Sequence, residues 1–172
     1  RARASFMVKE RTPDVFLIAN IGVNQLRDLG VERVERLCAD VGADALAVHL
    51  NPAMELIQPG READSDFSGG LSALREVTEA LDHVIVKECG CGISRSVAER
   101  LSAAGVKNVD VSGVGGTSWV KLEAMRAREE REYSREARLG MLLADWGIPT
   151  AAATWHAAQT PMRVISSGGI TD

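Results

Sequence analysis

The chain is poor in aromatic residues, which make up 4% of its 172 residues, and it contains only three cysteines. Proteins that bind single-stranded nucleic acids stack bases on aromatic side chains, and nucleic-acid surfaces in general are basic. With few aromatics and a net charge of -4, this chain is not expected to bind nucleic acid. The cysteines, Cys38, Cys89 and Cys91, follow no disulfide-framework spacing, which predicts a reducing cytoplasm. A lone C-x-C lacks the further ligands that a tetrahedral metal site needs.

Long apolar runs are also absent. No run reaches the roughly 20 residues of a membrane span, and the N-terminal RARASFMVKERTP has no apolar signal-peptide core. We therefore expect a cytoplasmic protein without a membrane partner. The chain begins with Arg1 and ends in SSGGITD, a strand and a Gly-Gly turn with no helix after it. We expect residues 1–172 to form one domain that is part of a longer protein.

Apolar runs alternate with amphipathic helical patterns, as in the βα repeats of a parallel sheet, whether closed as a barrel or open. The expected strands are 15–21, 45–50, 83–88, 107–112 and 163–167. The expected helices are 31–41, 71–81, 95–104, 121–144 and 151–158, the third capped by Ser96 with Glu99 or equally by Ser94. A polar loop spans 51–70 and carries Glu55, Glu62, Asp64 and Asp66. Loops of this length inside compact domains are often functional.

Polar residues follow each expected strand, at the end where parallel α/β proteins bind ligands. They are Asn20, His49 with Asn51, Lys87 with Glu88, Ser112 and 166–169. The glycine-rich loop that begins after Ser112 suits an anion such as phosphate, because its backbone N–H groups are accessible. It could equally be a tight turn that needs glycine, just as His49 could be a core histidine and Trp119 a core aromatic. A carboxylate such as Glu55 suits Mg²⁺.

Five segments of the chain, taken in order, resemble one enzyme family. They are ANIG at 19–22, HLNP with Glu55 at 49–55, VKE followed by GxGIS at 86–94, VDVSGVGGTSW at 109–119 and SSGG at 166–169. Together these segments resemble the type 2 isopentenyl-diphosphate Δ-isomerases, the flavin-dependent class of that enzyme. The VSGxGGTSW and HxNP motifs are fairly specific, whereas SGG is shared with many FMN-binding barrels.

The resemblance implies a (β/α)8 TIM barrel, of which this chain supplies about strands three to seven. It implies FMN, NADPH as the flavin reductant, Mg²⁺ and a homo-oligomer. The implied reaction, in isoprenoid biosynthesis, moves a double bond between isopentenyl and dimethylallyl diphosphate by proton addition and removal. Carried over by position, the resemblance implies that FMN is contacted by Asn20, Lys87, Ser112 and Thr117, and that its phosphate is contacted by Gly168 and Gly169. It implies that His49 and Asn51 contact the substrate diphosphate and that Glu55 binds Mg²⁺. It places Trp119 and Met54 in the catalytic pocket.

The chain departs from the family pattern in two places. The family reads HxNPxQE at 49–55, and Met54 stands where that pattern has glutamine, although a thioether donates no hydrogen bond. In QPGREADSDF at 58–67, Arg61 is inserted among the acidic residues. Three hypotheses stay open: this isomerase, whether active or impaired by Met54; another FMN-dependent TIM-barrel oxidoreductase with an altered substrate; or a non-enzymatic remnant that acts through its surface.

Overall fold

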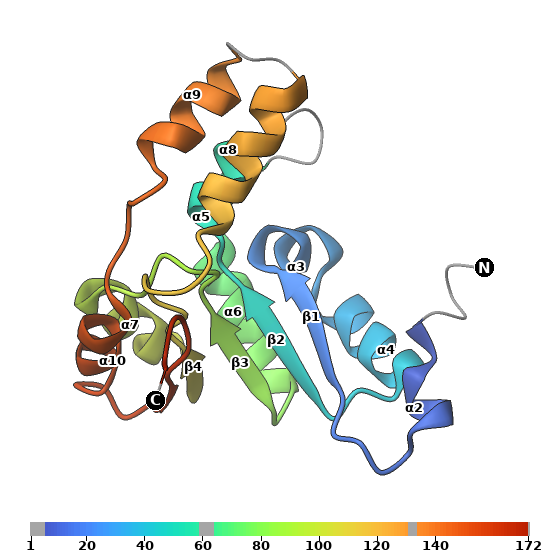
Figure 1. Cartoon of the computed structure of the whole chain (residues 1–172). Coiled ribbons are helices and arrows are strands. Elements are labelled where there is room, and N and C mark those ends of the chain that lie inside the picture. The colour runs from blue at the N-terminus through green and yellow to red at the C-terminus, as the bar shows by residue number, and fades with distance from the viewer. Residues whose placement is uncertain (1–5, 59–63, 131–133, 172) are drawn as a thin grey trace.

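A computed structural model of the chain describes residues 6–58, 64–130 and 134–171. Its centre is one parallel sheet whose five strands follow each other in chain order (Figure 1). The strands are β1 (Ile18–Gly22), β2 (Ala45–His49), β3 (Val84–Lys87), β4 (Asn108–Asp110) and β5 (Arg163–Ile165). Each lies within or overlaps an expected strand but is shorter. The prediction of an α/β fold with a parallel sheet is confirmed.

Four helices lie where the sequence pattern placed them. They are α4 (Val31–Val41), α6 (Gly70–Ala80), α7 (Arg95–Ala103) and α10 (Thr150–Ala157). Of the two possible caps of α7, the structure uses Ser94, whose hydroxyl oxygen accepts the N–H of Val97 at 3.3 Å. Three further helices were not expected: α2 (Val8–Arg11), α3 (Val23–Leu29) and α5 (Pro52–Glu55). The spacing of Val23, Leu26 and Leu29 was a signal for α3.

The single helix expected over 121–144 is wrong. The structure has two helices instead, α8 (Trp119–Glu130) and α9 (Arg135–Leu142). The second begins at Ser134, whose hydroxyl accepts the N–H of Ala137 at 3.0 Å, so a local cap starts a new helix within the charged stretch. The two helices pack closely, since a Cβ on Gly140 would lie 2.6 Å from the Ala124 Cβ. In Figure 1 this helix pair stands away from the sheet.

The hydrophobic core lies on one face of the sheet. Alternate strand residues such as Val48, Val86 and Val109 are fully buried there, and they pack against Leu74 of α6 and Leu101 of α7. Side chains along a strand alternate between the two faces, so the neighbours of these valines point the other way. The opposite face therefore receives the residues that precede and follow them, among which are the polar groups at the strand ends.

The five strands agree in number with the partial barrel that the resemblance implies, but the described residues do not show a closed (β/α)8 barrel. Their five strands run from β1 at one edge to β5 at the other, and each pairs in parallel with its neighbour in the chain. Barrel closure would join the edges, and no pairing within the described ranges does so. Nor does any helix in the described part of the chain have the length and apolar character needed to cross a membrane.

Candidate functional site

Polar side chains form a row across the sheet at the carboxyl ends of its strands. In the strand register, His49 pairs with Lys87, and Lys87 pairs with Asp110. These residues alternate with the buried valines and so belong to the face away from the helical core. Asn20 of β1 lies beside His49, with its side-chain nitrogen 3.2 Å from the His49 Nδ1. The structure thus brings together Asn20, His49 and Lys87, three of the predicted site residues.

His49 is partly buried and lies close to other backbone. A Cβ on Gly22 would be 3.0 Å from the His49 Nε2, so a larger residue there would require a small shift of the imidazole. Burial, and secondly the positive charge of Lys87, lowers the pKa of His49 from its ordinary value of 6.5. The imidazole is therefore neutral at pH 7, and one ring nitrogen is available to accept a hydrogen bond.

This lowered pKa predicts a pH dependence of stability. The unfolded chain takes up a proton on this histidine near pH 6.5, whereas the folded chain takes it up only at lower pH. Stability should therefore fall as the pH drops below about 6.5. In the His49→Asn variant, urea unfolding followed between pH 7.5 and 5 should show a smaller fall than the parent. His83→Asn, at an exposed position before β3, is the control, and an unchanged fall in His49→Asn would contradict the prediction.

Asp110 is a residue of the row that sequence reasoning missed. Its Oδ1 accepts hydrogen bonds from the Ser167 hydroxyl at 2.6 Å and from the Ser112 N–H at 3.1 Å, which ties the ends of β4 and β5 together. Ser112 has a positive φ of 36°, a conformation that side chains rarely adopt and that often occurs at functional sites. The signal that could have found Asp110 is its position in β4, on the same face as Lys87 of β3.

Lys87 has no carboxylate partner among the described residues. Its Nζ donates to the carbonyl oxygen of Glu88 at 3.1 Å and lies 3.8 Å from the Cys89 Sγ. Its charge acts on the nearby Glu88 carboxyl, whose pKa it lowers, but the two form no direct ion pair, and a partly buried ammonium group of this kind is suited to bind an anionic ligand. Ligand contacts at Lys87 and Asn20 stay a prediction.

The two glycine turns predicted to bind the FMN phosphate pack on each other. A Cβ on Gly168 would lie 2.2 Å from the Gly113 carbonyl oxygen, and one on Gly169 would lie 2.1 Å from the Gly115 carbonyl carbon. The close approach of the two backbones requires glycine at these positions, and phosphate binding by the turns stays a prediction. Thr117, in the same loop, is exposed. These glycines are explained by a tight turn, and no step is derived through FMN.

A polar cleft of about 510 Å³ opens beside the row, between β1, β2 and α5. Its wall includes the predicted substrate and metal residues His49, Asn51 and Glu55, together with Asn24 and Asp64. Asn51 stands at the start of α5 with a positive φ of 49°, which turns the chain so that Glu55 lines the cleft. Oxygen donors in a polar cleft fit a hard cation such as Mg²⁺. Among the described residues, no three His, Cys, Asp or Glu side chains converge as a complete metal cage.

Met54 and Trp119, the two positions assigned to the catalytic pocket, lie elsewhere. Met54 packs against an apolar cluster formed by Ala53, Ile57, Cys91 and Val120, and it does not line the polar cleft. Trp119 begins α8, half of its surface is exposed, and it too is outside the cleft. The structure thus groups His49, Asn51 and Glu55 but does not bring Met54 or Trp119 to them.

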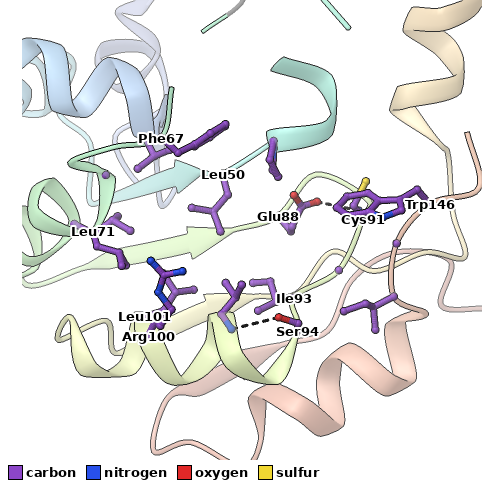
Figure 2. Close-up of a pocket in the computed structure, with 18 residues that line it drawn as sticks. Leu50, Phe67, Leu71, Glu88, Cys91, Ile93, Ser94, Arg100, Leu101 and Trp146 are labelled. Atoms are coloured by element: carbon purple, nitrogen blue, oxygen red, sulfur yellow. Dashed lines mark hydrogen bonds between the residues drawn. The ribbon is translucent and has the colours of Figure 1, made fainter. Parts of the chain in front are cut away.

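Glu88 lies on the other side of the sheet from the polar row. It lines a cavity of about 550 Å³ whose walls are mainly apolar and come from α6, α7 and the loop after β3 (Figure 2). Its Oε2 accepts the N–H groups of Cys89 at 2.5 Å and Cys91 at 2.9 Å. Burial raises the pKa of Glu88 and raises that of Cys91 to about 12. Glu88 therefore holds the loop after β3, and the Cys91 thiol stays protonated at neutral pH.

The fold and the cleft define an α/β protein with a polar ligand site at the carboxyl edge of a parallel sheet. Comparison with known proteins finds relatives named isopentenyl-diphosphate delta-isomerase. The chain is 44% identical over 165 residues to the one from Methanosarcina barkeri, which is 95% of this chain and 44% of the relative. For Pyrococcus furiosus the identity is 42% over 175 residues, with 98% and 43% covered. For Cronobacter sakazakii it is 44% over 169 residues, with 96% and 47% covered.

The relatives are longer than this chain. The chain spans less than half the length of the relatives from Methanosarcina and Pyrococcus. No family model matches it.

The narrower resemblance to the type 2 class has to be corrected. The relatives' names specify no type and no family model matches, so the type 2 assignment has no support among the known proteins. The flavoprotein assignment and NADPH as its reductant are not supported by these relatives either, because their names mention no flavin. What stands is similarity to isopentenyl-diphosphate delta-isomerases without a type.

Proposed function

We propose that the protein containing this chain isomerises isopentenyl diphosphate to dimethylallyl diphosphate. The observation that carries the proposal is identity of 42–44% to isomerases so named over 95–98% of the chain. The polar cleft supports it independently, because it combines a neutral imidazole, an amide and a carboxylate beside an unpaired lysine. A diphosphate requires hydrogen-bond donors and positive charge, and this edge of the sheet offers both.

Residues in and beside the cleft bind the diphosphate through different chemical groups. The side chains of Asn51 and His49 donate hydrogen bonds to phosphate oxygens, and Lys87 contributes charge from the neighbouring strand. Glu55 holds Mg²⁺, which neutralises diphosphate charge when bound. Asn20 fixes the orientation of the His49 ring through its contact with Nδ1. The isoprenoid end of the substrate then extends over the face of the sheet away from the helical core.

Cofactors other than the cation remain predictions of the sequence alone. FMN was predicted at Asn20, Lys87, Ser112, Thr117, Gly168 and Gly169, with NADPH as reductant, and no step of the proposal runs through either. The visible absorption spectrum of the natural full-length protein tests the flavin directly. Homo-oligomer formation stays a prediction in the same way, and sedimentation of the full-length protein tests it.

The deciding experiment is an isomerase assay of the natural full-length protein. Isopentenyl diphosphate is supplied with and without Mg²⁺, in the presence of the reduced cofactors that the sequence predicts, and dimethylallyl diphosphate is quantified. Product that depends on the protein and on Mg²⁺ supports the proposal, whereas absence of product under every condition overturns it. A parallel assay of Met54→Gln tests the sequence hypothesis of an impaired isomerase, which requires a marked gain in turnover. Because Met54 packs in an apolar cluster, we expect no such gain.

A further inference from the structure

The segment from Asp64 to Ser68 lies against α3 and is held there by the side chain of Arg27. The guanidinium forms an ion pair with Asp64, with Nη2 and Oδ2 2.6 Å apart. Its Nη1 donates to the carbonyl oxygens of Asp66 and, at 3.4 Å, of Ser68. One side chain thus contacts three residues of a segment about 40 positions further along the chain.

The segment is ordered further by its own side chains and by Asn24. The Asp66 N–H donates to the Asp64 Oδ1 at 3.0 Å, and the Ser68 N–H donates to the Asp66 Oδ1 at 2.9 Å. Asn24 donates its Nδ2 to the Asp64 carbonyl oxygen. The Asn24 Oδ1 is buried and has no hydrogen-bond partner among the described residues. Asp64 is therefore fixed through its carboxylate and its carbonyl.

The backbone of Asp64 in turn contacts the Glu55 side chain. Its N–H donates to the Glu55 Oε2 at 3.0 Å. This is the one hydrogen bond recorded for the Glu55 carboxylate within the described ranges. A hydrogen bond to one oxygen of a carboxylate restricts the rotation of the side chain and so limits the directions in which the other oxygen can point. Such outer contacts orient metal ligands and commonly change metal affinity by 10- to 100-fold.

We propose that Arg27 is a positioning residue that clamps Asp64 and thereby presets the Glu55 carboxylate for a divalent cation. The proposal rests on the proposed function in one respect, the role of Glu55 as the cation ligand. Arg27 is not itself a ligand, since it is a cation and its donors are already used by the 64–68 segment and by Asp28. The clamp joins α3 to α5 across the cleft, so it acts on the site that both helices line.

The experiment measures cation affinity and amide exchange on the natural full-length protein. Mn²⁺ binding is titrated by electron paramagnetic resonance for the parent, Arg27→Ala, Arg27→Lys and Glu55→Gln, and for Arg27→Ala combined with Glu55→Gln. We expect Arg27→Ala to weaken Mn²⁺ binding about tenfold and Arg27→Lys to restore part of the loss, because lysine keeps the charge but not the fork of donors. In the Glu55→Gln background, Arg27→Ala should have no further effect. Arg36→Ala, an exposed arginine of α4, is the matched control.

Hydrogen exchange tests the Arg27–Asp64 clamp independently of the proposed isomerase activity. The Asp64 amide should be protected in the parent and exposed in Arg27→Ala, while the core amides of β2 and β3 keep their protection. Equal protection of Asp64 in both proteins overturns the clamp, even if the protein proves inactive as an isomerase. Loss of protection with unchanged Mn²⁺ affinity overturns the link to Glu55. An active isomerase whose KM for Mg²⁺ is the same in Arg27→Ala would refute the inference and leave the proposed function intact.

Discussion

Replacing Glu55 by glutamine is expected to lower Mg²⁺-dependent isomerase turnover by about 100-fold or more in kcat/KM. The substitution keeps the shape of the side chain and an oxygen that can accept the Asp64 N–H, so the cleft should keep its structure. It removes the negative charge that a hard cation requires. The measurement is steady-state kinetics at a series of Mg²⁺ concentrations, in which the variant should need much more Mg²⁺ to reach half of its own maximal rate.

The matched control is Glu79→Gln, an exposed glutamate on α6 away from the cleft, which should leave the kinetics unchanged. Thermal unfolding of both variants without cation shows whether the fold is retained. If Glu55→Gln keeps the parent's activity and Mg²⁺ dependence, Glu55 is not the cation ligand. The proposal for this cleft would then be wrong, whatever the substrate.

Replacing Gly113 by alanine is expected to destabilise the fold by about 3 kcal/mol or more. The new Cβ would lie 2.4 Å from the Thr150 Cα and 2.6 Å from the Thr150 nitrogen, and both of these are backbone atoms at the start of α10. Flexible side chains can give way, whereas a helix start cannot move without disturbing its neighbours. The Gly113 N–H also donates to the Ser167 carbonyl oxygen at 2.9 Å, so relief of the clash would strain the joint between β4 and β5.

Gly30→Ala separates this steric effect from the ordinary cost of replacing a glycine. Gly30 has a φ of 76° and lies between α3 and α4, and its Cβ would meet nothing within 4 Å. Its replacement should cost about 2 kcal/mol through backbone strain alone, because φ 76° with ψ 157° is a conformation that essentially only glycine adopts. Urea unfolding of both variants gives the comparison, and equal losses for Gly113→Ala and Gly30→Ala would contradict the close approach of Gly113 to α10.

Much of the fold could be predicted because its signals are local. Apolar runs bounded by polar residues marked the five strands, and the helix at 31–41 was placed to the residue by its apolar spacing and by Gly42. The break between α8 and α9 was missed because charged helical residues continue on both sides of Ser134. The helix α3 was missed because seven residues directly after a strand give a weak periodic signal.

The candidate site was predictable only in part. His49, Asn51 and Glu55 are close in sequence and lie in one cleft, so a local motif was enough to group them. Arg27 and Asp64 are 37 positions apart, and no pattern in the sequence shows that one side chain holds the other segment. Met54 lies next to Glu55 in the chain, yet it points into an apolar cluster, because successive residues of a short helix face different directions.

The sequence by itself determined the parallel α/β class, the positions of its strands along the chain and the polar residues at their ends, since these follow from hydrophobic periodicity and from connections too long for hairpins. The tertiary structure alone decided which polar residues meet. Strand register set His49 beside Lys87 and Lys87 beside Asp110, and packing of the 64–68 segment on α3 brought Asp64 to Glu55. It also decided that the turn at Gly168 and Gly169 packs against the backbone of Gly113 and Gly115. Contacts between distant segments depend on the exact path of the backbone, which local patterns do not specify.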